Sequence, residues 1–221
     1  MMSDFRFEEQ KMTSLRHKIT DDIRKAIFQG KLKPGDRLRE VDMAKQMGVS
    51  RGPIREAMRM LEQEGVINSQ PYKETMVAEI SAEEVMEVLV PIRLTIELFA
   101  IRKALPNIQE PQIERLTQII ADMKEGAAQK DLHKIVDCDL AFHEYLVTLS
   151  NVPNLLGIWT TIFNRIRLHF IVQGQTYEDF NDLWHNHELL LAKIKEGNLA
   201  EIYEELTRHI EDFNSGFLED K

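Results

Sequence analysis

The chain of 221 residues contains a single cysteine, Cys138, and therefore has no internal disulfide framework. This scarcity fits a reducing compartment, and we expect Cys138 to be a small buried apolar side chain. The sequence also lacks any apolar run of the roughly 18 to 20 residues that a membrane-spanning helix needs, and residues 1–11 are polar and acidic, unlike a signal peptide. These absences predict a soluble cytoplasmic protein that does not enter a membrane.

Positive charge is scarce overall, with 28 Lys and Arg against 37 Asp and Glu and a formal net charge of −9. The average hides an asymmetry, because residues 1–78 hold 15 basic and 12 acidic residues, net +3, whereas residues 79–221 hold 13 and 25, net −12. Only the N-terminal part can approach a polyanion such as nucleic acid. The change of net charge between these two parts predicts two domains, 1–78 and 79–221. The 43% of hydrophobic residues are enough for a core in each.

Residues 50–65 predict a helix with well-marked ends. Ser50 suits the N-cap, Pro53 falls in the first turn, and Gly65 suits the left-handed residue that closes a helix. One face of this helix is apolar and the opposite face is cationic. The apolar residues are Ile54, Ala57, Met58 and Leu61, and the cationic residues are Arg51, Arg55 and Arg59. By itself the pattern also fits an ordinary surface helix with a solvated charged face.

The neighbouring segments favour a DNA-binding unit. A shorter helix comes before residues 50–65, and only Gly48 and Val49 separate the two. Two helices joined by such a turn form a helix-turn-helix, whose second helix enters the DNA major groove. Two short strands after the second helix can pair as a wing across residues 70–73. The predicted winged helix-turn-helix has three helices, 14–29, 40–47 and 51–64, and a two-stranded wing, 66–68 and 75–77.

This part of the chain contains a series of short motifs, Pro34-Gly35, Gly48-Val49-Ser50-Arg51, Pro53, Arg55-Glu56-Ala57, Leu61-Glu62 and Glu64-Gly65. With this series it resembles the GntR family of bacterial transcription regulators. The resemblance implies a protein that binds a double-stranded DNA operator. It also implies that Arg51 and Arg55 read bases, with guanine as the natural target of their bidentate guanidinium groups.

Other contacts to DNA are expected from charge. Arg39 and Lys45 are candidates for phosphate contacts, and Arg59 is expected at the backbone or in solvent. The family's wing usually carries Arg-Gly after its proline, whereas this chain has Lys73-Glu74. Phosphate repels Glu74, so contacts of the wing depend on Lys73. The expected DNA-binding residues are Arg51, Arg55, Arg39, Arg59, Lys45, Lys73 and Ser50.

The second part predicts an antiparallel bundle of six or seven helices, with no sheet, glycine-rich phosphate loop or internal repeat. A capping box, Ser81-Ala82-Glu83-Glu84, starts the first helix, and Pro91 must kink or divide it. Short connections make consecutive helices antiparallel neighbours. Further helical patterns lie at 92–105, 112–128, 132–149, 154–172, 179–195 and 199–213.

Three histidines and a carboxylate have a spacing that lets them converge inside this bundle. Asp139 and His143 are four residues apart and share one helix face. His187 precedes the turn at Gly197 by ten residues and His209 follows it by twelve, so on antiparallel helices the two imidazoles lie at nearly the same height. Such a set suits Zn²⁺, Ni²⁺, Mn²⁺ or Fe²⁺, although isolated core or surface histidines are the commoner case.

The histidines of the second part lie in three short motifs, Asp139-Leu140-Ala141-Phe142-His143, His187-Glu188-Leu189-Leu190 before Gly197-Asn198, and His209-Ile210. With these motifs the second part resembles the metal-binding members of the FCD-type ligand-sensing domain, found in the FadR branch of the same family. The resemblance implies a divalent transition metal, expected to be zinc with nickel, manganese or iron as alternatives. Its expected ligands are Asp139, His143, His187 and His209.

The same resemblance implies a pocket for a small organic acid. Arg93 matches the arginine of an Arg-x-x-x-Glu motif, completed by Glu97, and such an arginine faces the cavity and pairs with a ligand carboxylate. Asn151 matches an asparagine that follows the Asp/His helix, and Arg165 is a further candidate for the cavity. The alternative for Arg93 is an i, i+4 surface ion pair with Glu97.

These features predict a ligand-responsive regulator that acts as a homodimer, because a single winged helix reads only a few base pairs. The resemblance implies repression that a small carboxylate effector relieves as the commoner behaviour of the family, with activation as the alternative. Two rival functions stay open, a regulator in which the ion itself is the signal and a metal-dependent hydrolase-type enzyme. The enzyme is disfavoured, because no acidic residue near the histidines stands out as a general base.

Overall fold

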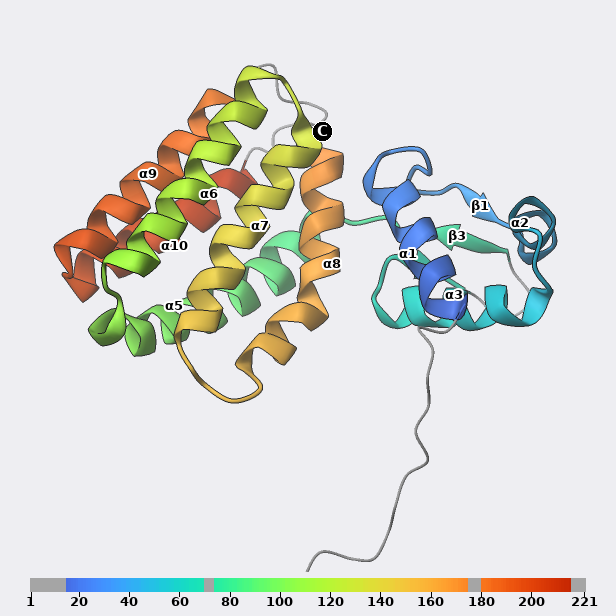
Figure 1. The fold of residues 1–221 in the computed structure, drawn as a ribbon, viewed down its shortest axis with the longest axis horizontal. Coiled ribbons are helices and arrows are strands. Elements are labelled where there is room, and N and C mark those ends of the chain that lie inside the picture. Colours follow the sequence, from blue (N-terminus) through green and yellow to red (C-terminus); the bar gives the residue numbers. More distant parts are fainter. Residues whose placement is uncertain (1–14, 70–73, 175–179, 216–221) are drawn as a thin grey trace, which may run out of the picture.

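The structure is a computed structural model that describes residues 15–69, 74–174 and 180–215. It has two parts that lie side by side, a helix bundle and a smaller N-terminal part that contains the strands (Figure 1). Within the described ranges, no helix is long and apolar enough to cross a membrane. The predicted fold class, a mostly helical protein with a small antiparallel wing, is confirmed.

The N-terminal part is built from three helices and a small antiparallel sheet. The helices are α1 (Leu15–Phe28), α2 (Glu40–Met47) and α3 (Arg51–Gln63), and the strands are β1 (Arg37–Leu38), β2 (Ile67–Asn68) and β3 (Thr75–Val77). The predicted pairing of β2 with β3 is confirmed. The sheet has three strands and not the predicted two, because β1 joins the other edge of β3. Two residues are too few to show an alternating pattern in the sequence.

The ends of α3 lie where the local sequence places them. Ser50 is at the N-cap with extended backbone, although its side chain makes no capping hydrogen bond. Gly65 follows the helix with φ +68°, in the left-handed region that glycine adopts without strain. The apolar face packs against α1 in a shared core. Its buried residues are Ile54, Ala57, Met58 and Leu61.

The bundle begins with a helix that Pro91 divides. A short helix, α4 (Ala82–Glu84), runs into a π-helical segment (Val85–Leu89) and then into α5 (Val90–Ala104). Proline has no N–H for the carbonyl four residues before it, and its ring crowds that carbonyl, which favours a wider turn ahead of it. Ser81 caps α4, because its hydroxyl accepts a hydrogen bond from a backbone N–H of the first turn.

Long helices complete the predicted bundle. They are α6 (Glu110–Ala128), α7 (Leu132–Leu149), α8 (Leu155–Gly174), α9 (Asn181–Glu196) and α10 (Leu199–Ser215). The central helix is α7, which packs against α5, α6 and α8. A tight turn at Gly197, with φ +75°, joins α9 to α10 and sets them side by side.

Helix α8 joins the two parts of the molecule. Its Leu168 packs in the core of the N-terminal part. The Arg165 guanidinium donates to the carbonyl oxygen of Gly65 at 2.9 Å and to the carboxylate of Glu84 at 2.8 and 2.5 Å. Because Gly65 lies two residues after the last residue of α3, the C-terminal end of this helix is attached to the bundle.

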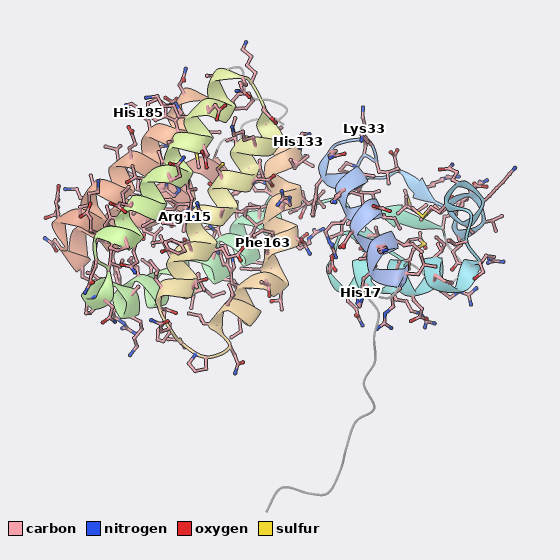
Figure 2. The ribbon with its side chains drawn as sticks, viewed as in Figure 1. His17, Lys33, Arg115, His133, Phe163 and His185 are labelled. Carbon is pink, nitrogen blue, oxygen red and sulfur yellow. The ribbon has the colours of Figure 1, made fainter. Side chains whose placement is uncertain are left out.

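A second polar contact lies next to Arg165. Asn164 donates to the carboxylate of Glu64 at 3.0 Å, and Arg24 of α1 donates to the same carboxylate at 2.8 and 2.6 Å. A cavity of about 380 Å³ lies between the two parts at this contact, and its walls include His133 and Phe163 (Figure 2). The two parts therefore touch where α8 meets α1 and the end of α3, and they leave space beside this contact.

Candidate metal centre and nucleic-acid interface

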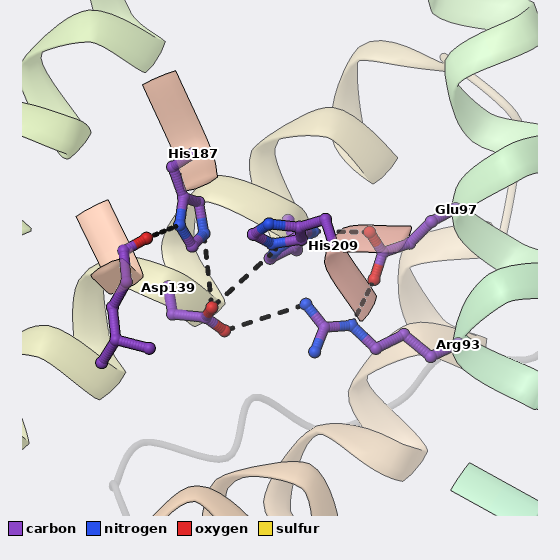
Figure 3. A network of polar contacts seen from close by, with 7 residues as sticks. Arg93, Glu97, Asp139, His187 and His209 are labelled. Carbon is purple, nitrogen blue, oxygen red and sulfur yellow. Dashed lines mark hydrogen bonds and ion pairs between the residues drawn. The ribbon is translucent and has the colours of Figure 1, made fainter. Parts of the chain in front are cut away.

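The four predicted metal ligands come from three helices and meet inside the bundle. Helix α7 supplies Asp139 and His143, α9 supplies His187 and α10 supplies His209 (Figure 3). Their ligand atoms all lie within 4.8 Å of one another, and all four side chains are buried. The structure therefore brings the whole predicted set together, and an aspartate with three histidines can hold a divalent metal.

In two of the histidines, a hydrogen bond at Nδ1, the outer ring nitrogen, turns Nε2, the inner ring nitrogen, towards the cluster. Nδ1 of His143 lies 2.5 Å from Oε2 of Glu97, and Nδ1 of His187 lies 2.7 Å from the carbonyl oxygen of Leu183. Carboxylate and carbonyl oxygens accept hydrogen bonds, so each Nδ1 carries the proton and each Nε2 keeps its lone pair. These are the tautomers that a metal ion needs.

The inner atoms face one another at distances that favour a cation between them. Nε2 of His143 lies 3.1 Å from Nε2 of His209, and Nε2 of His187 lies 3.3 Å from Oδ1 of Asp139. Lone pairs in this arrangement repel each other unless a proton or a metal ion lies between them. Nε2 of His187 and Oδ2 of Asp139 are buried and have no hydrogen-bond partner among the described residues. The residues present therefore fit a metal ion.

The protonation states of the cluster suit metal binding. Burial lowers the pKa of His143, and the charge of Arg93 lowers it further. Burial and the neighbouring histidines lower the pKa of His209 well below its ordinary value. Burial by itself raises the pKa of Asp139, but the close approach of His187, 3.3 Å from Oδ1, and the charge of Arg93 outweigh it and bring the pKa to about 2. Neutral imidazoles and an ionised carboxylate are the forms that bind metal.

Arg93 and Glu97 form a buried ion pair beside the cluster. Their side chains are 3% and 0% exposed, and Nε of Arg93 donates to Oε1 of Glu97 over 2.7 Å. The arginine also approaches Asp139, with 3.8 Å between Nη2 and Oδ2, and lies over the ring of Phe170, 5.5 Å from its centroid. The alternative of a surface ion pair is therefore wrong, because α5 buries both residues against the cluster.

The buried carboxylate of Glu97 is ionised. Burial raises the pKa of Glu97, but the charge of Arg93 and the hydrogen bonds from His143 and Arg93 lower it below its ordinary value. Its two oxygens connect α5 to the metal cluster on α7. The sequence motif indicates Glu97 only as the partner of Arg93, and nothing in the spacing indicates a contact with His143, which is 46 residues away.

A narrow cavity adjoins the cluster at Asp139. Its volume is about 10 Å³, and its other walls are mainly apolar side chains of α6, α7, α8 and α9. Gly174 closes one side so tightly that a Cβ atom there would lie 2.3 Å from Cδ1 of Leu132. The cavity has room for about one water molecule. An organic acid that binds at this point has to displace side chains of the walls.

Two further residues predicted for the ligand pocket lie elsewhere. The Arg165 guanidinium contacts Gly65 and Glu84, at the boundary between the two parts. Asn151 is an exposed residue after α7 with φ +51°, a conformation that often ends helices. The structure brings neither residue to the histidines, and their role in ligand binding stays a prediction.

Cys138 is half-buried and not fully buried as expected. Burial raises the pKa of its thiol to about 11, and the nearby Asp122 adds to this. The thiol is therefore protonated near neutral pH and is a poor nucleophile.

The three arginines of α3 form an exposed cationic face. Arg51, Arg55 and Arg59 expose 58%, 52% and 65% of their side chains. Ser50, just before the helix, and Lys45 of α2 are also exposed. The face opposite the apolar core is therefore accessible to DNA, as the helical pattern predicts.

Glu40, the first residue of α2, pairs with two of these arginines. Nη2 of Arg51 donates to Oε2 of Glu40 over 2.9 Å, and Nε of Arg55 donates to Oε1 over 3.2 Å. Hydrogen bonds from Arg55 and Arg51 lower the pKa of Glu40, so it is ionised at neutral pH. The carboxylate holds both guanidinium groups side by side in the absence of DNA. The sequence does not indicate this contact, because it depends on how α2 packs on α3.

The acidic residue of the wing is paired within the sheet. Glu74 lies 2.7 Å from Nε of Arg37 and 3.5 Å from Nη2 of Arg39. These two positive charges offset the expected repulsion between Glu74 and phosphate. Arg39 is exposed, as a phosphate contact requires, and Arg37, which belongs to none of the sequence motifs, is a further exposed cation. Lys73 lies outside the described residues.

Known proteins resemble this chain over most of its length. The family model described as bacterial regulatory proteins, gntR family, matches residues 15–77, and the model of the FCD domain matches residues 87–212. The HTH-type transcriptional regulator YdhC of Bacillus subtilis (strain 168) is 28% identical over 203 residues, which cover 89% of this chain and 87% of the relative. The gluconate operon transcriptional repressor of Bacillus subtilis (strain 168) is 25% identical over 201 residues, which cover 88% and 82%.

A solved structure shows the same fold. A GntR transcriptional regulator from Rhodococcus sp. RHA1 superposes with a TM-score of 0.83 at 23% sequence identity, over 95% of this chain and 100% of that one. The chain therefore belongs to the GntR family of bacterial regulatory proteins, carries an FCD domain, and is a DNA-binding transcription regulator and not an enzyme.

Proposed function

We propose that this protein represses transcription at an operator read by α3, and that a small carboxylate bound beside a metal ion in the FCD domain releases it. The observation that carries the proposal is the convergence of Asp139, His143, His187 and His209 in a domain attached to a DNA reader. Relatives named as repressors of a gluconate operon and of a D-xylose utilization operon support repression.

The metal would be held by the carboxylate and the three inner Nε2 atoms. When bound, it supplies positive charge and an open coordination position for an oxygen of the effector. We propose zinc, because one carboxylate and three imidazoles form a set that zinc prefers, and nickel, manganese and iron accept the same atoms.

The charges around the cluster favour an anionic effector only in the metal-bound protein. Asp139 and Glu97 are ionised and Arg93 is positive, so with the three imidazoles counted as neutral the formal charge of the site is −1 without metal. A divalent cation changes this charge to +1, which one carboxylate neutralises. Nη2 of Arg93 has no hydrogen-bond partner among the described residues and is available to that carboxylate. These features support a chelating hydroxy acid.

Helix α8 is the proposed link from this site to DNA. The Arg93 guanidinium lies over Phe170 of α8, and Arg165 of the same helix contacts Gly65 at the end of α3. An effector that draws Arg93 towards itself alters the packing of α8 and so favours one orientation of the DNA-binding part. To change DNA affinity, the effector must bind the two orientations with different affinities.

We also propose that the protein acts as a homodimer in the cytoplasm. Two copies on a two-fold operator double the bases read by α3. Cross-linking and sedimentation of the protein with and without operator DNA test this state, and a monomer on a single half-site would contradict it.

Operator binding in the presence of defined ligands tests the proposed function. The operator is first obtained by selecting genomic fragments that the purified protein binds. Its affinity is then measured by fluorescence anisotropy with Zn²⁺ alone, with a hydroxy acid such as gluconate or citrate alone, and with both. We expect the affinity for the operator to fall only when Zn²⁺ and the acid are both present, because the acid needs the metal in order to bind. A change with Zn²⁺ alone would identify the ion as the signal, and an acid that acts on chelator-treated protein would contradict the metal-containing pocket.

A further inference from the structure

We propose that Glu97 is the positioning residue of the metal centre, because it fixes the tautomer and the ring orientation of His143. The proposal rests on metal binding at the cluster described above. Glu97 lies on α5, outside the four-residue ligand set, and is completely buried. A carboxylate in an apolar interior is stable only when donors satisfy both of its oxygens. The identity of those donors therefore indicates what the residue does.

Both oxygens of Glu97 are used, and they serve different partners. Oε1 accepts a hydrogen bond from Nε of Arg93 over 2.7 Å, whereas Oε2 lies 2.5 Å from Nδ1 of His143 (Figure 3). Arg93 supplies the positive charge that keeps the carboxylate ionised, so the carboxylate accepts and the ring donates. The proton of neutral His143 must then be on Nδ1, and the Nε2 lone pair must point at His209 and Asp139.

Comparison of the three rings shows why His143 depends on a side chain. Nδ1 of His187 donates to the carbonyl oxygen of Leu183, four residues earlier in its own helix, and a backbone acceptor is present whatever the sequence. Nδ1 of His209 has no hydrogen-bond partner among the described residues. His143 therefore has the one charged acceptor among these three described rings. A carboxylate in that place also makes the imidazole a stronger metal ligand.

Substitution of Glu97 by glutamine tests the role with little change of shape. In Glu97→Gln the amide NH₂ must face either Arg93 or Nδ1 of His143, and both of these are donors. His143 escapes the conflict by moving its proton to Nε2, where the proton blocks the metal. We expect Zn²⁺ to bind about 10- to 100-fold more weakly, measured by competition with a chromophoric chelator. Unchanged affinity would overturn the proposal.

Tyr203→Phe is the matched control. The hydroxyl of Tyr203 on α10 donates to the carbonyl oxygen of Leu98 on α5 over 3.0 Å. Its removal loosens the helices that carry His209 and Glu97 without touching the cluster. We expect wild-type affinity for Zn²⁺ in this variant. A loss as large as that of Glu97→Gln would show that Glu97 acts through general packing, and would overturn the positioning role.

The tautomer itself is measured in metal-free protein labelled with ¹⁵N-histidine. Two-bond ¹H–¹⁵N correlation spectra show whether Nδ1 or Nε2 carries the proton, and a His143→Ala variant identifies the signals of His143. We expect the proton on Nδ1 in the wild type and on Nε2 in Glu97→Gln. A wild-type ring with its proton on Nε2 would overturn the proposal even if Glu97→Gln fails to fold.

The failure of this proposal is distinguishable from that of the proposed function. If the wild-type protein binds no Zn²⁺, the metal-containing pocket is wrong, whatever the tautomer of His143. If the wild type binds Zn²⁺ and Glu97→Gln binds it equally well, only the positioning role is wrong. Glu97→Asp, which keeps the charge but shortens the reach, should show the same loss of affinity as Glu97→Gln and serves where the glutamine variant does not fold.

Discussion

Charged residues in the interior of this protein stabilise one another at the level of single side chains. Arg93 and Glu97 lie one helical turn apart on α5, and Asp139 approaches the same guanidinium from α7. A buried ion left without its partner costs several kcal/mol, so such residues persist in a core only as a connected group. The group here surrounds three neutral imidazoles, an arrangement that a simple apolar core does not require.

Removal of two metal ligands should remove the metal. Each of His143 and His209 contributes an Nε2 atom to the cluster, so His143→Ala combined with His209→Ala leaves too few donors for tight binding. Elemental analysis of the purified double variant should show no stoichiometric metal. His185→Ala is the control, because His185 lies on α9 two residues before His187 but is 62% exposed (Figure 2). A full equivalent of metal in the double variant would exclude this ligand set.

Protonation of His143 and His209 should weaken metal binding only below the ordinary histidine range. Burial lowers the pKa of His143 and of His209 below the usual value of 6.5, so protons compete with the metal only at lower pH. The affinity for Zn²⁺ should therefore stay constant as the pH falls towards about 7 and decrease once the pH passes through the lowered pKa values. Chelator competition at several pH values checks this, and a decrease that begins above neutral pH would contradict neutral imidazoles.

Base reading by α3 can be separated from phosphate binding on the same helix. Arg51→Ala or Arg55→Ala should weaken specific binding by about 1 to 3 kcal/mol and relax the preferred sequence, because a bidentate contact to guanine is lost. Arg59→Ala should weaken binding to all DNA sequences alike and reduce the salt dependence of binding by about one released ion. Selection of binding sites from a random DNA pool measures both effects. An unchanged preferred sequence in the Arg51 and Arg55 variants would exclude base reading.

At the scale of elements, α8 has two structural roles. It is a core helix of the bundle, and its Arg165 also donates a hydrogen bond to the carbonyl oxygen of Gly65, just after the end of α3. Gly65 must be small, because a Cβ atom there would lie 2.7 Å from Cδ of Arg165. The C-terminus of α3 and the surface of α8 therefore fit each other only when residue 65 has no side chain.

Two glycines allow this fit to be measured. Gly65 and Gly48 both follow helices with positive φ, +68° and +66°, but a Cβ atom at Gly48 would meet nothing within 4 Å. Gly48→Ala should therefore show backbone strain alone, about 1 to 2 kcal/mol of unfolding free energy. Gly65→Ala should destabilise the protein more, and the difference should vanish when Arg165→Ala is present in both. Urea unfolding measures these free energies. Equal effects of Gly48→Ala and Gly65→Ala in the wild-type background would show that Arg165 moves to make room for the new side chain.

For the whole molecule, metal binding and folding should be linked. The ligands come from α7, α9 and α10, so the unfolded chain cannot form the same site. Zn²⁺ at a free concentration of 100 times its dissociation constant should raise the free energy of unfolding by about 2.7 kcal/mol. Thermal unfolding with and without Zn²⁺ measures this gain. The variant with His143→Ala and His209→Ala should gain nothing, and an equal gain there would place the stabilising ion elsewhere.

The amino-acid sequence by itself determined the elements and the family. The ends of α3 at Ser50 and Gly65 and the apolar stripe that includes Leu61 are local features, which depend on backbone conformation and helical periodicity. The convergence of His187 and His209 also followed from the sequence, because a short turn and the rise per residue set their heights on two adjacent helices.

Only the tertiary structure decided which side chains from distant segments touch. Glu40 pairs with Arg51 and Arg55, Glu97 accepts from His143, and Arg165 contacts Gly65 100 residues away instead of the histidines. The pairing of β1 as a third strand and the small cavity at the metal cluster are also decided by the tertiary structure. Such contacts depend on the angles and rotations at which helices pack, and these result from the fit of many side chains at once. Periodicity along one helix shows which residues face inward, but it does not show which residues they meet.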